Sequence, residues 1–281
     1  MPTKKFEKKY EEIKKDNTHG AGYLVEKTLQ ALKEENERKK LTKKEWEKLL
    51  GKFEKIHQGI TALQTIITKI KKETEQQKEV TKKTIKESIE KAEKEIRKKK
   101  KKTIEKTAEE ISKQKKIMTL SASTTIYKAL EKIPEKEREN ITIYMLESRP
   151  MFEGKTQAEK IAGLGYKTRL IADAAMGYFA NEVHAMIVGA DTLYTDGAIV
   201  NKIGSLPLAL VAKYYEKPYI VATTTLKEKE KTEKKPRKEI REKPPEEILK
   251  ETKKDQLEAR NIYFDYIPKE LITKIITEKK R

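Results

Sequence analysis

The chain has 281 residues, of which 40% are charged and 36% hydrophobic, and it carries a formal net charge of +19. No stretch approaches the roughly 18 successive apolar residues that a membrane-spanning helix needs, so we expect no membrane association. Cysteine is absent, which excludes disulfides, thiolate metal sites and cysteine nucleophiles. The composition therefore predicts a soluble, cytoplasmic protein.

The positive charge is concentrated at the two ends of the sequence. Residues 1–115 hold 34 basic and 21 acidic side chains, and residues 227–281 hold 18 and 13, whereas residues 140–226 hold 8 of each. The basic run at 97–102 could contact phosphates, but it contains no aromatic side chain that could stack on a base. Nucleic-acid binding by the basic helices is thus one hypothesis, and a solvated charged surface is the simpler interpretation. We therefore look for the functional site first in the electrically neutral residues 140–226.

Residues 1–115 are expected to form an all-helical domain. Apolar residues recur three or four positions apart between 24 and 32 and again between 56 and 70. From 71 to 115 the apolar residues thin to one narrow stripe among Lys and Glu, which is typical of a long solvated helix.

From residue 116 the pattern alternates between short apolar strands and helices, which predicts an α/β fold. The resulting domain, 116–281, should be a Rossmann-like parallel sheet with helices on both faces. Residues 227–256 are predicted to form a charged, solvent-exposed loop with one helix near 245–253. A last helix is expected to start near Pro268. The expected strands are 117–120, 140–146, 168–172, 185–188 and 218–222, and the expected helices between them are 124–132, 156–164, 176–181 and 206–215.

Ligands of parallel sheets bind at the carboxyl ends of the strands, where polar side chains are expected to gather. The three histidines are too scattered for a metal site, and no cofactor motif is present, so we expect neither a metal nor a cofactor. The polar candidates at the strand ends are Ser121, residues 147–149, Asp173, Asp191 and Thr223.

Five motifs in the second half of the chain occur in a specific order. They are Glu-Ser-Arg-Pro-x-x-Glu-Gly at 147–154, Asp-Ala-Ala-Met-Gly-Tyr at 173–178, Val-Gly-Ala-Asp at 188–191, Asn-Lys-Ile-Gly-Ser at 201–205, and a closing Phe-Asp-Tyr-Ile-Pro at 264–268 followed by Ile-Ile-Thr-Glu at 275–278. Together they resemble the signature of the translation initiation factor 2B alpha/beta/delta family.

The resemblance implies two kinds of function. The family contains regulatory subunits of the exchange factor for initiation factor 2, with archaeal relatives, and isomerases for ribose 1,5-bisphosphate and methylthioribose 1-phosphate. Our main hypothesis is an archaeal alpha-subunit-like regulatory protein that binds initiation factor 2, chiefly its alpha subunit. The resemblance also implies a homodimer or larger oligomer built through the C-terminal domain.

The alternative is a sugar-phosphate isomerase, and three departures from the isomerases speak against it. The isomerase cysteine position is Ser121, and a hydroxyl is a poor proton acceptor near neutral pH. The phosphate-binding Arg-Gly-Ala motif of the isomerases is replaced by His19, Gly20 and Ala21, and a second arginine motif by Gln-Gly-Ile at 58–60. The isomerase aspartate is retained as Asp191, so any isomerase activity would use Asp191, with Ser121 at the cysteine position.

The retained polar groups still predict a pocket for a sugar phosphate or a nucleotide. A simpler interpretation is that Asp191 caps the following segment and that Asn201 and Lys202 brace a turn. Asp173 and Gly177 are expected to be structural. The complete set of candidate ligand-binding residues is His19, Gly20, Ala21, Ser121, Ser123, Arg149, Asp191, Asn201 and Lys202.

Overall fold

A computed structural model describes residues 2–16, 20–56, 60–77, 79–230, 242–250 and 256–279. The chain divides into two compact units, one of residues 1–100 with 226–228 and one of residues 101–225 with 229–281. The division falls inside helix α5 (Lys82–Ile111), fifteen residues before the domain boundary expected from the sequence. No helix in the described residues is both long enough and apolar enough to cross a membrane.

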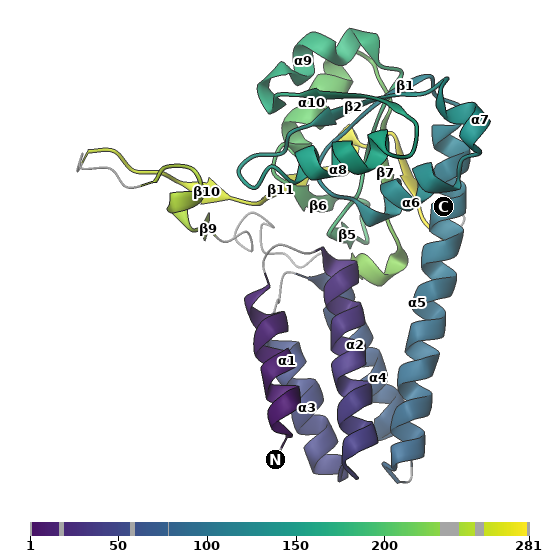
Figure 1. Ribbon diagram of the computed structural model, residues 1–281, viewed down its shortest axis with the longest axis vertical. Helices are drawn as coiled ribbons and strands as arrows, with labels where there is room; N and C mark the ends of the chain where they lie inside the picture. Colours follow the sequence, from purple (N-terminus) through teal and green to yellow (C-terminus); the bar gives the residue numbers. More distant parts are fainter. Residues whose placement is uncertain are drawn as a thin grey trace. The chain divides into compact units, whose positions relative to one another are not determined.

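The first unit is helical, as the sequence predicts (Figure 1). Its core is a single apolar cluster around the buried side chains of Trp46 and Phe53. The Trp46 indole donates a hydrogen bond to the buried Thr74 hydroxyl at 3.1 Å, so the polar atom of this large side chain is satisfied. Besides the first part of α5, the helices are α1 (Lys4–Lys15), α2 (Ala21–Arg38), α3 (Lys43–Lys55) and α4 (Thr61–Glu75).

The second unit contains the expected parallel sheet, with six strands in the order β12-β7-β4-β1-β2-β3. Every pairing in this sheet is parallel. The strands are β1 (Lys116–Thr119), β2 (Thr142–Leu146), β3 (Lys167–Ile171), β4 (Ala185–Val188), β7 (Tyr219–Ala222) and β12 (Lys274–Ile276).

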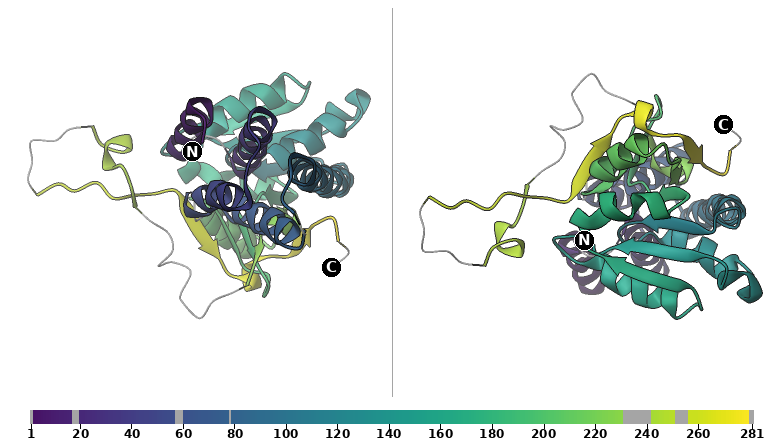
Figure 2. Two further views of the ribbon diagram at one scale, coloured as in Figure 1. Left: turned by 90° about the horizontal axis from the view of Figure 1, so that it is seen from below. Right: turned by 90° about the horizontal axis from the view of Figure 1, so that it is seen from above.

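Helices cover both faces of this sheet, because successive side chains of each strand enter different cores. In β2, Ile143 and Met145 join a cluster with residues of α6 and α8, whereas Tyr144 and Leu146 join a cluster with residues of α9 and α10. Figures 1 and 2 show these helices around the sheet. They are α6 (Thr124–Lys132), α8 (Glu153–Ala162), α9 (Met176–Phe179) and α10 (Ser205–Tyr214), and a short α7 (Glu135–Arg138) follows α6.

Three expected helices differ in the structure. The helix expected near Pro268 is a single 3-10 turn, Lys269–Leu271, followed by β12, because the β-branched residues after it favour an edge strand beside β7. The helix expected at 245–253 is a turn at Pro245–Glu247, and residues 251–255 lie outside the described part of the chain. The helix expected at 176–181 is the short α9, continued by a 3-10 turn at Ala180–Glu182.

A smaller antiparallel sheet, ordered β11-β6-β5-β8, was not expected from the sequence. Its strands are two to four residues long, which is too short for a clear alternation of apolar and polar residues. They are β5 (Thr192–Tyr194), β6 (Ile199–Lys202), β8 (Glu228–Lys229) and β11 (Phe264–Ile267), and a separate pair is formed by β9 (Glu242–Lys243) and β10 (Asn261–Ile262).

Candidate functional site

The carboxyl ends of β1, β2 and β3 are tied together by hydrogen bonds. The backbone N–H of Ser121 donates to the Ser148 hydroxyl at 2.8 Å, and the backbone N–H of Ser148 donates to the Asp173 carboxylate at 2.9 Å. The end of β4 lies close by, because a Cβ added at Gly189 would meet the Ser123 hydroxyl at 3.0 Å. Ser121, Ser148 and Asp173, three of the polar residues expected at the strand ends, therefore lie together at one edge of the sheet.

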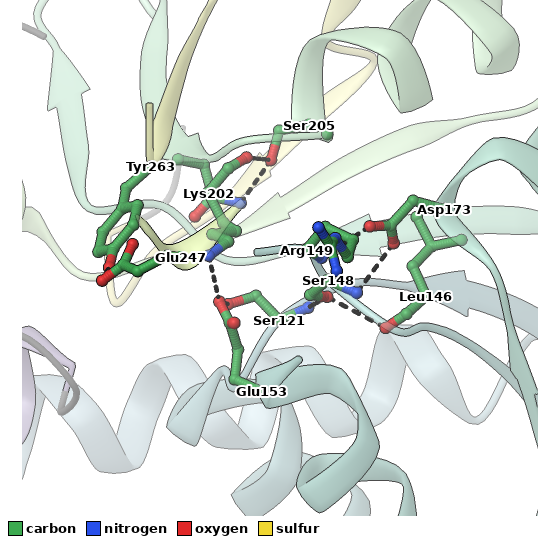
Figure 3. Close-up of polar contacts among 12 residues, drawn as sticks. Ser121, Leu146, Ser148, Arg149, Glu153, Asp173, Lys202, Ser205, Glu247 and Tyr263 are labelled. Carbon is green, nitrogen blue, oxygen red and sulfur yellow. Dashed lines mark hydrogen bonds and ion pairs between the residues drawn. The ribbon is translucent and has the colours of Figure 1, made fainter. Parts of the chain in front are cut away.

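Three side chains from three elements meet at this edge (Figure 3). The Ser121 hydroxyl, after β1, donates to Oε1 of Glu153 at 3.0 Å. The Lys202 ammonium, at the end of β6, lies 2.9 Å from the same Glu153 oxygen. The structure thus brings together a hydroxyl, a carboxylate and a cation, which we call the Ser121–Glu153–Lys202 cluster.

The place of Glu153 depends on how α8 starts. The helix begins at Glu153, three residues earlier than the sequence suggests. A Cβ at the next residue, Gly154, would lie only 1.9 Å from the Leu146 carbonyl oxygen, so only glycine lets this first turn sit against the end of β2. The close approach carries the Glu153 carboxylate to the carboxyl edge of the sheet.

Two serines of the site have left-handed backbone conformations, which non-glycine residues rarely adopt. Ser121 has φ 61° and Ser148 has φ 64°. The Ser148 hydroxyl helps to hold both turns, since it accepts from Ser121 and donates to the Leu146 carbonyl at 3.0 Å. Such conformations persist where surrounding contacts enforce them, and they cluster at functional sites.

Lys202 lies over an aromatic ring at the edge of the cluster. Its ammonium is 4.9 Å from the centre of the Tyr263 ring, and its side chain is 8% exposed. The Tyr263 hydroxyl donates to the Glu247 carboxylate. Burial, helped by this carboxylate, raises the pKa of the Tyr263 hydroxyl, so it stays a neutral donor at physiological pH.

Arg149 and Asp173 meet through the backbone. The Arg149 N–H donates to the Asp173 carboxylate at 2.7 Å, while the exposed Arg149 guanidinium lies 4.8 Å from the centre of the Phe152 ring. Asp173 accepts from two successive backbone N–H groups and thereby fixes the turn after β2.

We expect Asp173→Ala to lower the free energy of unfolding by about 2 kcal/mol, because two backbone donors lose a charged acceptor. Equilibrium urea unfolding measures the change. Asp173→Asn keeps one acceptor oxygen and should fall between this variant and the unaltered protein. An unchanged unfolding midpoint for Asp173→Ala would show that the turn does not need the carboxylate.

The Asn201 side chain stabilises the turn between β6 and α10. Its amide donates to the buried Ser205 hydroxyl at 2.9 Å, and that hydroxyl donates to the Lys202 carbonyl at 2.6 Å. Asp191 lies between β4 and β5, half-buried, with its backbone N–H donating to the Val200 carbonyl at 2.8 Å. Ser123 caps α6, since its side chain accepts from the Ile126 N–H.

The other candidate residues belong to the helical unit. His19 lies outside the described residues, Gly20 is the N-cap of α2, and Ala21 is its buried first residue. Gly20 and Ala21 belong to the first unit, whereas Ser121, Glu153 and Lys202 belong to the second.

Sequence reasoning missed Glu153, Glu247 and Tyr263. A helix expected to begin at Thr156 left Glu153 in a loop, although a glycine directly after it signalled a close backbone approach. The contacts of Glu247 and Tyr263 join segments that have no local sequence signal. Within the described residues, no three histidine or acidic side chains come together as metal ligands would.

A sequence profile of the initiation factor 2 subunit family matches residues 17–279. The chain is 36% identical over 170 residues to a ribose 1,5-bisphosphate isomerase of Archaeoglobus fulgidus, covering 58% of this chain and 52% of that protein. It is 32% identical over 162 residues to a putative translation initiation factor eIF-2B subunit 2-like protein of Pyrococcus furiosus, covering 58% of this chain and 55% of that protein. The chain thus spans about half the length of these relatives.

Solved structures share the fold. The translation initiation factor eIF-2B of Pyrococcus horikoshii superposes with a TM-score of 0.82 at 23% identity, covering 98% of this chain and 96% of that one. A 5-methylthioribose 1-phosphate isomerase of the same organism gives a TM-score of 0.80 at 23% identity, with coverages of 97% and 83%.

Proposed function

This chain belongs to the initiation factor 2 subunit family, and from that premise we propose that it binds a ribose phosphate at the carboxyl edge of its parallel sheet and isomerises it to a ribulose phosphate. The observation that carries this proposal is the Ser121–Glu153–Lys202 cluster at the strand ends. The 36% identity to a ribose 1,5-bisphosphate isomerase supports it over our main sequence-based hypothesis, a regulatory protein.

The chemistry defines what the site has to provide. In a ribose 1-phosphate ester the anomeric carbon carries the phosphate, so isomerisation opens the C1–O4 bond and moves a hydrogen from C2 to C1. Asp191, between β4 and β5, is the proposed acid/base that moves this hydrogen. Lys202 supplies a positive charge for a phosphate or a developing oxyanion.

The direct test is incubation of the purified chain with ribose 1,5-bisphosphate and detection of ribulose 1,5-bisphosphate. We expect product to accumulate in proportion to protein concentration. No turnover by the unaltered protein would overturn the proposal.

A second candidate function is binding of the initiation factor 2 alpha subunit without catalysis. It is favoured by the serine at position 121 and by the similarity to an eIF-2B subunit 2-like protein. A pull-down with purified initiation factor 2 alpha subunit, with and without sugar phosphates, tests it, and absence of binding under both conditions would reject it. Either function would place the chain in the cytoplasm.

We also propose that the chain forms a homodimer through α9 and α10. These two helices pack against each other and expose large apolar side chains, namely Tyr178 at 82%, Tyr214 at 81% and the half-exposed Leu210. Leu210 and Tyr214 are four residues apart and so share one face of α10. Structural likeness to an eIF2B-beta2-delta2 complex supports association with family members. Exposed apolar surface of this kind marks interaction sites.

We expect Leu210→Glu to convert the dimer into a monomer, because the buried interface would then contain an unpaired charge. Light scattering coupled to size exclusion measures the mass. Leu170→Glu, which changes a half-exposed leucine on the edge strand β3, should leave the dimer intact. A dimer that survives the Leu210 change, or is lost equally with both changes, would place the interface elsewhere.

A further inference from the structure

Glu153 links two residues that the sequence already singled out. Its Oε1 accepts from the Ser121 hydroxyl at 3.0 Å and pairs with the Lys202 ammonium at 2.9 Å. Figure 3 shows Glu153 rising from α8 toward both side chains. The carboxylate is therefore the one group among the three that touches both of the others.

The second oxygen of this carboxylate is in an unusual position. Oε2 of Glu153 is buried and has no hydrogen-bond partner among the residues that the structure describes. A buried carboxylate oxygen without a protein partner is energetically costly, so such an oxygen is a place for a bound water, an ion, a ligand or a chemical role. The Glu153 side chain as a whole is 24% exposed.

The geometry of the contact is fixed by the backbone. Gly154 holds the first turn of α8 against the Leu146 carbonyl, and the left-handed turn at Ser121 is held by Ser148. Neither Ser121 nor Glu153 can move far without breaking these contacts. A preorganised hydroxyl–carboxylate pair of this kind can pass a proton with little reorganisation.

We propose that Glu153 is a positioning residue that receives the proton which the Ser121 hydroxyl passes on from the ligand, with Lys202 holding the carboxylate in place. This role rests on the proposed isomerase function. This role for Glu153 explains how Ser121 could take part in proton transfer, although its hydroxyl is by itself a poor proton acceptor near neutral pH.

The proton and electron balance is simple for the last step of the isomerisation, from the enol to the ketone. The O2–H bond of the enol breaks and its proton goes to Ser121 Oγ, while the hydroxyl proton of Ser121 moves to Oε1 of Glu153. The C2=O bond forms, and the C1=C2 electron pair takes a proton at C1 from Asp191. The proton on Glu153 then leaves to solvent, and solvent supplies the proton that the ring oxygen O4 requires when the C1–O4 bond of the next sugar opens, so Glu153 starts each turnover ionised beside Lys202.

The absence of cysteine from the chain allows a test that does not depend on turnover. Ser121→Cys introduces a single thiol, and the pH dependence of its alkylation reports the pKa of that thiol. In this background Glu153→Gln should lower the thiol pKa by about one unit, because a hydrogen-bond acceptor and negative charge are lost beside Lys202. Lys202→Met should raise the thiol pKa by about one unit for the opposite reason.

The other charged groups at this edge include Asp173, Asp191, the exposed Arg149, Glu247 and Lys243 beside Tyr263, and the Glu147–Lys155 pair, and all are left unchanged in these variants. Glu159→Gln is the matched control, because Glu159 is an exposed acid on the same helix. A thiol pKa that stays the same in the Glu153 and Lys202 variants, as in the Glu159 control, would overturn the proposal.

Turnover provides the second arm in the natural Ser121 background. We expect Glu153→Gln to lower kcat about 100-fold with little change in KM, and Glu153→Asp to recover part of the loss. A kcat that is the same in Glu153→Gln and Glu159→Gln would also overturn the proposal. If the unaltered protein has no turnover, the proposed function fails, and the thiol titration still decides whether Glu153 controls the proton on residue 121.

Discussion

Asp191→Asn is expected to lower the isomerase kcat by at least about 100-fold, because an amide cannot accept the proton from C2. The change keeps the size of the side chain, and the backbone N–H of Asp191, which donates to the Val200 carbonyl, is unaffected. Product formation from ribose 1,5-bisphosphate is measured at several substrate concentrations, so that kcat and KM are separated.

The matched control for this variant is Asp196→Asn in the turn between β5 and β6. Asp196 is exposed and accepts from the Ala198 N–H through an oxygen that asparagine also has. We expect this control to retain the turnover of the unaltered protein. Turnover by Asp191→Asn equal to that of the control would remove Asp191 from the mechanism.

Gly154→Ala is expected to destabilise the protein by about 3 kcal/mol, because the added methyl group would lie 1.9 Å from the Leu146 carbonyl oxygen. The backbone has to move to relieve this contact, and Glu153 moves with it. We therefore expect loss of turnover together with a lower midpoint of urea unfolding.

Gly163→Ala at the other end of α8 is the control for this substitution. Gly163 has φ −62°, and an added Cβ would meet carbonyl oxygens only at 3.4 and 3.5 Å. Alanine fits there, so the stability should stay the same or rise by up to about 1 kcal/mol. Similar losses of stability in the two variants would show that the close approach at Gly154 is not the cause.

Only part of the site could be predicted from the sequence. The alternation of strands and helices predicts that Ser121 and Asp191 follow parallel strands, and this already places them at one edge of the sheet. The partner of Ser121 could not be predicted in the same way. Glu153 reaches it only because α8 starts against β2. Gly154 signals a close backbone approach, but the sequence does not say which segment it approaches.

The structure also changes the interpretation of the serine at position 121. The sequence shows a serine where the resemblance implies the isomerase cysteine, and the missing thiol was an argument against catalysis. The structure pairs this serine with a carboxylate and a nearby ammonium group, which is the arrangement that a hydroxyl needs to pass a proton.

The amino-acid sequence by itself determined the helical first part, the parallel sheet with helices on both faces and the family membership, because these depend on local periodicity and ordered motifs. The tertiary structure alone decided that the segment after Pro268 ends in β12 instead of a helix, and that Lys202 and Glu153 meet at Ser121. Both outcomes depend on partners that are distant in the sequence. Strand pairing and ion pairing between distant segments stabilise the protein only once those segments have come together in the fold. The local pattern of residues along the sequence therefore does not predict them.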